Sequence, residues 1–96
     1  MFKELDPLLH SQLRLAVMSL LIGVKEADFS FLKEKTESSA GNLSVQIGKL
    51  SEAGYITVTK SFKDNYPLTT CKISPTGIAA FEKYVENIGS YLKEKK

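Results

Sequence analysis

One stretch of the sequence decides the fold: residues 38–62 read SSAGNLSVQIGKLSEAGYITVTKSF. Its first half predicts a helix over about 39–54, because apolar residues recur at i, i+4 and i+7 and a glycine follows. The residues of this apolar face are Leu43, Ile47 and Leu50. From 56 to 62, apolar and polar residues then alternate, which is the period-two pattern of a strand. The stretch therefore predicts a helix that leads directly into a strand.

The segments on either side supply the remaining elements. Before the stretch, apolar residues at helical spacing predict a helix over about 7–21 and a short one over about 28–36. After it, turn-forming residues at 63–67 separate the first strand from a second strand at 69–73. A last helix is expected over about 75–93, because Ser and Pro at its start are favoured at the N-cap and first helical positions. The residues expected on the inner face of the strands are Ile56, Val58, Phe62, Cys71 and Ile73.

These elements define a fold class. The order is α-α-α-β-β-α, a mainly α chain with a small β hairpin (α+β). The second and third helices are separated by a short polar turn around 37–39, which is the spacing of a helix-turn-helix. A hairpin directly after that unit is a wing, so the pattern predicts a winged helix-turn-helix. The 96 residues fit a single domain, expected to span 1–96.

Composition excludes several classes of protein. With 43% apolar and 25% charged residues, the chain is in the range of globular proteins and outside that of disordered ones. No basic stretch followed by a long apolar one begins the chain, and the apolar segment 13–24 is interrupted by Arg14. We therefore expect a cytoplasmic protein that does not enter a membrane.

Chemically reactive residues are sparse. Cys71 is the only cysteine and His10 the only histidine, so we expect no disulfide within the chain and no metal site. The sequence has no glycine-rich phosphate loop and no histidine at a catalytic spacing from an acid. It thus predicts neither an enzyme nor a cofactor, and Cys71 is expected to be a buried, inert thiol.

Four stretches give the chain a resemblance to a known family. They are LDPLLH (5–10) running into RLAV (14–17), GNLS (41–44), LSEAGYI (50–56) and ISPTG (73–77). In this order they resemble the small stand-alone winged-helix regulators related to the ArsR and MarR groups of prokaryotic transcription factors. The resemblance implies sequence-specific binding of DNA by a homodimer, with the helix at about 39–53 in the major groove. Many relatives carry arginines at the wing tip, whereas residues 63–68 here read KDNYPL. The wing at about 60–70 is therefore expected near the DNA backbone or the minor groove.

The helix at 39–53 has an outward face that suits DNA. When its apolar stripe faces the core, small and polar side chains face outward. Asparagine and glutamine can each bond an adenine edge, lysine can reach guanine or phosphate, and Val45 can touch a thymine methyl group. Serines at the helix start and lysines around the hairpin suit phosphate. The candidate DNA-binding residues are Ser38, Ser39, Gly41, Asn42, Ser44, Val45, Gln46, Lys49, Lys60, Lys63 and Asn65.

Two alternatives stay open for this face. The polar residues also suit an ordinary solvated helix with serine caps, and a winged-helix protein-interaction module would use the same fold without binding DNA. The net charge of only +2 keeps the second alternative open. One continuous positive face over the helix, Lys60 and Lys63 in the dimer would favour DNA, whereas a neutral or acidic face would favour a protein partner. Arg14, the only arginine, can reach the DNA backbone or pair with an acid, and the structural role is the one expected. The sequence leaves open whether a small-molecule effector acts on the protein.

The last helix carries more apolar surface than a domain of this size needs. An exposed apolar stripe is unfavourable on a monomer, and a two-fold partner can cover it. We therefore expect a homodimer through the helix at about 75–93, with help from the first helix. The alternative is that the stripe folds back on the first helix of the same chain. The predicted interface residues are Ile78, Phe81, Tyr84, Val85, Ile88, Tyr91 and Leu92.

Overall fold

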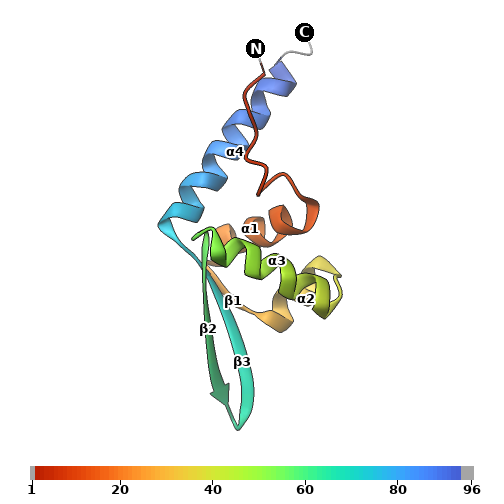
Figure 1. The fold of residues 1–96 in the computed structure, drawn as a ribbon, viewed down its shortest axis with the longest axis vertical. Helices are drawn as coiled ribbons and strands as arrows, with labels where there is room; N and C mark the ends of the chain where they lie inside the picture. The colour runs from red at the N-terminus through yellow and green to blue at the C-terminus, as the bar shows by residue number, and fades with distance from the viewer. Residues whose placement is uncertain (1, 94–96) are drawn as a thin grey trace.

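The fold is a winged helix drawn out at both ends (Figure 1). The computed structural model describes residues 2–93. Its elements are α1 (Gln12–Val24), β1 (Glu26–Asp28), α2 (Phe29–Thr36), α3 (Ala40–Glu52), β2 (Ile56–Lys63), β3 (Tyr66–Ile73) and α4 (Pro75–Lys93). The β2–β3 hairpin and α4 extend from the body of the molecule in opposite directions, which gives dimensions of 56 × 25 × 21 Å. Within 2–93, no helix is both long and apolar enough to cross a membrane.

The predicted helix-turn-helix is formed by α2 and α3. Asp28 caps α2 by accepting a hydrogen bond of 2.8 Å from the backbone N–H of Phe31. Ser39 caps α3 in the same way, through a bond of 3.1 Å from the N–H of Asn42. Between them, Glu37 takes the left-handed conformation that ends α2. Both helices and their caps are confirmed.

The hairpin is longer and its turn tighter than predicted. β2 and β3 pair antiparallel over their full length, so the turn contains only Asp64 and Asn65. Both have positive φ (52° and 68°), the conformation of two-residue hairpin turns, and Asp and Asn accept it more readily than most residues. The predicted turn at 63–67 is therefore wrong at both ends, since Lys63 ends β2 and Tyr66 begins β3.

A third strand that the sequence did not predict completes the sheet in the order β1-β3-β2. β1 has only the residues Glu26–Asp28, too few to show an alternating pattern. It pairs antiparallel with β3, with Ala27 opposite Cys71, so β3 is the central strand. The fold remains the predicted α+β class, with a sheet of three strands in place of a hairpin alone.

Helix α1 begins later than predicted. Residues 7–10 form a separate turn, in which the side chain and the carbonyl of Asp6 each accept a backbone hydrogen bond of 2.9 Å. The chain is then extended at Ser11, and the helix begins after it. Asp6 and Pro7, a pair typical of a helix start, therefore begin only a single turn here. At the other end, Gly23 lies inside α1, and Lys25 supplies the positive φ of 73° that ends the helix.

The core is formed by one face of each of the first three helices and by the inner face of the sheet. The apolar stripe predicted for α3 is buried in it. Burial raises the pKa of the Cys71 thiol to about 11, so the thiol stays protonated at neutral pH. Phe62 was expected to face inward, but β2 extends beyond the core there and Phe62 is 76% exposed. The largest fully buried side chains are Leu9, Val17, Met18, Leu21, Leu32, Leu43, Leu50 and Cys71.

Residues 2–10, which we call the N-terminal segment, run alongside α4 (Figure 1). The side-chain amide of Asn87 donates to the carbonyl of Glu4 (3.1 Å), and the hydroxyl of Tyr91 donates to the carbonyl of Lys3 (2.9 Å). The acceptors in these bonds are main-chain carbonyls, which every residue carries. No residue type in the N-terminal segment therefore predicts this packing.

The start of α4 packs against the end of α3 without space for a side chain. The Ser74 hydroxyl donates to the carbonyl of Gly54 (2.6 Å) and accepts from the N–H of Gly77 (2.9 Å). A Cβ on Gly77 would lie 2.0 Å from the carbonyl oxygen of Tyr55, so glycine is required there. Two of the four stretches that resemble the winged-helix family, LSEAGYI and ISPTG, meet at this contact.

Candidate nucleic-acid interface

The exposed face of α3 carries the residues that were predicted to lie outward. Val45, at its centre, is 55% exposed. Gln46 is half-buried on the flank beside α1. Small side chains dominate the face, so the helix backbone can approach a partner closely. The exposed residues of α3 include Gly41, Asn42, Ser44, Val45, Gly48, Lys49 and Glu52.

A groove of about 450 Å³ lies between α3 and the hairpin. Its hairpin wall is the core-facing side of the sheet, continued past the core, because Lys60 and Thr69 form a cross-strand pair two residues beyond Val58 and Cys71. Lys60 brings a positive charge to the groove, and Glu52 a negative one. The groove is lined by Phe29, Ser44, Ile47, Gly48, Ser51, Glu52, Val58, Lys60 and Thr69.

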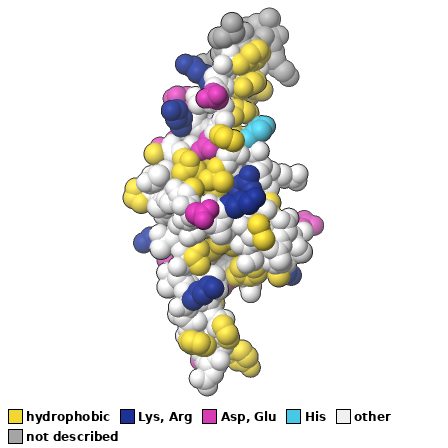
Figure 2. Space-filling model, in the orientation of Figure 1, with side chains coloured by type: hydrophobic (Ala, Val, Ile, Leu, Met, Phe, Trp, Pro, Cys, Tyr) yellow, Lys and Arg dark blue, Asp and Glu magenta, His cyan; other side chains and the backbone are white. Residues whose placement is uncertain are grey.

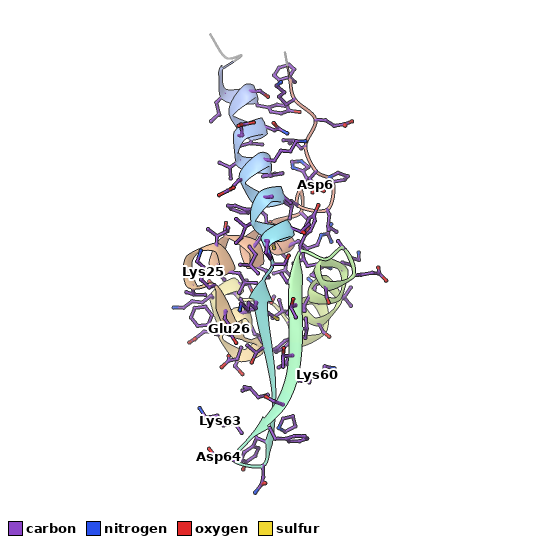
Figure 3. All side chains as sticks on the ribbon, turned by 90° about the vertical axis from the view of Figure 1, so that its left-hand side faces the viewer. Asp6, Lys25, Glu26, Lys60, Lys63 and Asp64 are labelled. Atoms are coloured by element: carbon purple, nitrogen blue, oxygen red, sulfur yellow. The ribbon has the colours of Figure 1, made fainter. Side chains whose placement is uncertain are left out.

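The two hairpin lysines predicted to contact DNA lie on opposite faces. Side chains alternate along a strand, so Lys60 shares the groove face with Val58 and Lys63 has the other face. Figure 3 shows their side chains on opposite sides of the hairpin. On the face drawn in Figure 2, single basic side chains are separated by uncharged and acidic ones. Residues 2–93 of one chain therefore do not form a single positive face that includes α3, Lys60 and Lys63.

Arg14 reaches α3 from the first turn of α1. Its Nε donates to the carbonyl of Leu8 (2.6 Å), and its Nη1 donates to Oε1 of Gln46. Nε2 of Gln46 in turn donates to Oδ1 of Asn42 at 3.0 Å. Two predicted DNA-binding residues are thus linked to each other and to α1. The structural role expected for Arg14 is observed, with an amide as its side-chain partner.

Three other candidate residues have local structural roles. Ser39 caps α3, and the hydroxyl of Ser38 shares a hydrogen bond of 2.8 Å with that of Thr36. Asn65 forms half of the hairpin turn. Ser39 and Asn65 are nevertheless exposed and accessible to a partner. Among residues 2–93, no cluster of His, Cys, Asp or Glu is placed to hold a metal ion.

The apolar stripe of α4 is divided between two environments. Tyr84 is buried, and its hydroxyl is 2.9 Å from Nδ1 of His10. Tyr91 stacks on Phe2 with ring centroids 4.8 Å apart. The N-terminal segment, which neither sequence-based alternative considered, therefore covers this side of the helix. Of the other stripe residues, Ile78, Phe81 and Ile88 are partly buried, while Val85 (50%) and Leu92 (64%) are exposed.

Sequence reasoning missed parts of this site, and one of them left a signal. Strand alternation counted back from the inward Cys71 places Thr69 and its partner Lys60 toward the groove and Lys63 away from it. The bond between Arg14 and Gln46 joins residues 32 positions apart, and no local pattern predicts it.

A helix-turn-helix, a hairpin directly after it and a groove between the two define a winged-helix protein of the DNA-binding class. The family described as "Winged helix DNA-binding domain" matches residues 13–92, and the chain belongs to this family.

Comparisons with individual proteins give one sequence relative and similar folds among solved structures. An uncharacterized protein of Methanocaldococcus jannaschii is 34% identical over 79 residues, which are 82% of this chain and 86% of the relative. The transcriptional regulator homologue protein from Pyrococcus horikoshii OT3 has a similar structure, with a TM-score of 0.86 at 22% identity over 93% of this chain and 88% of that one. The YusO protein from Bacillus subtilis gives a TM-score of 0.76 at 18% identity over 95% of this chain and 60% of that one. The predicted winged-helix fold is confirmed.

Proposed function

We propose that the protein is a sequence-specific DNA-binding transcriptional regulator that acts as a homodimer. The observation that carries the proposal is the exposed, small and polar face of α3, which borders the groove that contains Lys60. Membership of the winged-helix DNA-binding family supports DNA as the ligand. The structural likeness to a transcriptional regulator homologue supports a role in transcription.

In the proposed complex, α3 enters the major groove. Asn42 and Lys49 face base edges, and Val45 faces a thymine methyl group. One strand of the DNA backbone follows the groove beside α3, where Lys60 pairs with a phosphate and the Ser44 hydroxyl donates to another. The contacts with phosphates hold the protein in register on the DNA, whereas the contacts with base edges select the sequence.

The proposed homodimer uses the exposed side of α4. Val85 and Leu92 are left uncovered, whereas the N-terminal segment occupies the side with Tyr84 and Tyr91. A two-fold axis through this stripe presents two copies of α3 to a palindromic site, with half-sites about one helical turn, roughly 34 Å, apart.

Selection of genomic fragments by the purified protein over a salt series tests the proposal. We expect enrichment of one palindromic sequence, with binding that weakens as salt rises, because lysine contacts with phosphate release counterions. The slope should be shallow for a DNA-binding protein, since few lysines border the site. No enrichment at low salt, where phosphate contacts are strongest, would contradict the proposal.

A protein-interaction winged helix is the second candidate, and the hairpin tip favours it. Phe62 and Tyr66 are 76% and 74% exposed there, and Figure 2 shows hydrophobic side chains at this end of the molecule. Exposed aromatic side chains are typical of protein contacts. Failure to retain any DNA fragment, even at low salt, would favour this candidate over the first.

A further inference from the structure

The hydrogen bonds that start at Arg14 determine which way two amide side chains point. A guanidinium can only donate, so the Gln46 atom that faces it has to be the carbonyl Oε1. The other end of that amide, Nε2, also only donates, and the Asn42 atom that it meets at 3.0 Å is therefore Oδ1. The donor Nδ2 of Asn42 is consequently turned away from Gln46.

The start of this chain of bonds is firmly held. Arg14 is half-buried, and its second bond, from Nε to the carbonyl of Leu8, measures 2.6 Å. Hydrogen bonds from a charged donor are about twice as strong as neutral ones, and they polarise the acceptor so that its next bond strengthens as well. Val17 and Met18, three and four residues further along α1, are both fully buried, so Arg14 is attached to a rigid part of the helix.

The end of the chain of bonds is open to a ligand. Asn42 is exposed in the first turn of α3, and its backbone N–H is already bonded to the Ser39 hydroxyl at 3.1 Å. Asn42, Gln46, Arg14 and Ser38 line one cavity of about 460 Å³ beside this turn. The side-chain Nδ2 is therefore the donor that Asn42 offers to a molecule docked on α3.

We propose that Arg14 is a positioning residue that sets the base preference of Asn42 through Gln46. This inference rests on the proposed function. With Nδ2 outward, Asn42 donates to base atoms that accept, and guanine offers two of them, N7 and O6, side by side in the major groove. The two-point contact of asparagine with adenine needs both the oxygen and the nitrogen of the amide to face the base. In the arrangement held by Arg14, the oxygen faces Gln46, so guanine is favoured over adenine.

Gln46 then has a different role from the one the sequence suggested. Both ends of its amide are bonded within the protein, to Arg14 and to Asn42. It transmits the orientation and does not read a base.

Substitutions of Gln46 and Arg14 test the proposal by changing the orientation. Gln46→Glu keeps an acceptor for Arg14 but cannot donate to Asn42, so the Asn42 amide turns over and presents its oxygen. The preference should then move to adenine or cytosine, which carry donors in the major groove. Arg14→Met removes the fixed donor, so both orientations coexist and the preference disappears. Arg14→Lys is the matched control, because lysine also only donates and should keep guanine.

The measurement is selection from duplexes with a randomised central stretch, using the full chain. For the unmodified protein we expect guanine over adenine at one position of each half-site, by a factor of roughly five, which is what one hydrogen bond of ordinary net strength supports. We expect the reverse preference for Gln46→Glu. If Gln46→Glu and Arg14→Met both select the same base as the unmodified protein, the inference is wrong and the proposed function stands. If the unmodified protein selects no sequence, the proposed function is wrong and the inference with it.

A second readout needs no DNA. The side-chain amide NMR signals of Asn42 and Gln46 should both shift in Arg14→Met, and an unchanged Asn42 signal would contradict the proposal. Should Arg14→Met fail to fold, as circular dichroism would reveal, Gln46→Glu still decides, because it leaves Arg14 paired with an acceptor.

Discussion

Among the glycines, Gly77 is the one at which an added side chain has the least room. A Cβ there would lie 2.0 Å from the carbonyl oxygen of Tyr55 and 2.9 Å from its carbonyl carbon, and neither backbone atom can rotate away. Gly77→Ala therefore has to displace the first turn of α4, and we expect it to lower the free energy of unfolding by about 2–3 kcal/mol.

The matched control for this prediction is Gly89→Ala in the same helix. Apart from the adjoining residues and the backbone of α4 itself, no heavy atom lies within 4 Å of a Cβ built at Gly89, and alanine is the better helix former. That variant should raise the free energy of unfolding by about 0.5–1 kcal/mol. Urea titrations followed by circular dichroism measure both, and equal effects would show that the contact with Tyr55 is unimportant.

Tyr55 makes stability depend on alkaline pH. Its hydroxyl donates to Asp6 at 2.5 Å, and this bond, with burial and the nearby carboxylate charge, raises the pKa of Tyr55 from 10.0 to about 12. The unfolded chain thus loses this proton before the folded one. The stabilising contribution is complete below pH 10 and is lost as the pH rises toward 12.

We therefore expect Tyr55→Phe to lose less stability than the unmodified protein between about pH 9 and about pH 11.5. Urea midpoints at the two pH values measure the difference. Tyr91→Phe serves as the control, because the Tyr91 hydroxyl bonds a carbonyl and not a carboxylate. Parallel losses in the unmodified protein and in Tyr55→Phe would refute the assignment.

The β2–β3 hairpin separates two lysines that sequence analysis had placed in one DNA-binding site. Lys60 lines the groove beside α3, and Lys63 lies on the opposite face. We expect Lys60→Ala to weaken DNA binding and to lower the salt slope by about one, which is the loss of one phosphate contact. Lys63→Ala, with the same change of charge, should alter both quantities much less. Binding titrations over a salt series check the pair, and equal effects would mean that the groove does not hold the backbone.

Local patterns predicted the elements whose cause is local. The α3 stripe and the caps Asp28 and Ser39 follow from helix periodicity and hydrogen-bonding side chains, so they were predicted correctly. The second strand was predicted too short because Pro67 usually interrupts a strand. Pro67 is tolerated in β3 because β3 extends past the end of β1 there and has only one neighbouring strand.

The candidate site was predicted as far as one element could reveal it. Periodicity identified the exposed face of α3, since it determines which side chains leave the core. The bond from Arg14 to Gln46 and the packing of the N-terminal segment depend on how distant elements meet. The spacing of residues along the sequence does not show how distant elements pack together.

The exposed apolar stripe on α4 predicts the oligomeric state of the protein. Val85→Glu and Leu92→Glu place a charge on this stripe, and we expect each to convert a dimer at micromolar concentration into a monomer. Ala79→Glu is the matched control, since it adds the same charge at another exposed position of α4. Sedimentation velocity measures the state. An unmodified monomer, or variants that sediment with the unmodified dimer, would rule out this interface.

The N-terminal segment also has a consequence for the order in which the molecule is completed during synthesis. The N–H of Lys3 donates to the Ser90 hydroxyl at 3.0 Å, between residues 87 positions apart. A ribosome adds Lys3 long before it adds Ser90, so residues 2–4 lack their partners on α4 while α1, α2 and α3 are made and can pack through contacts of shorter range. The residues of this contact that are made first are therefore placed only after α4 has emerged.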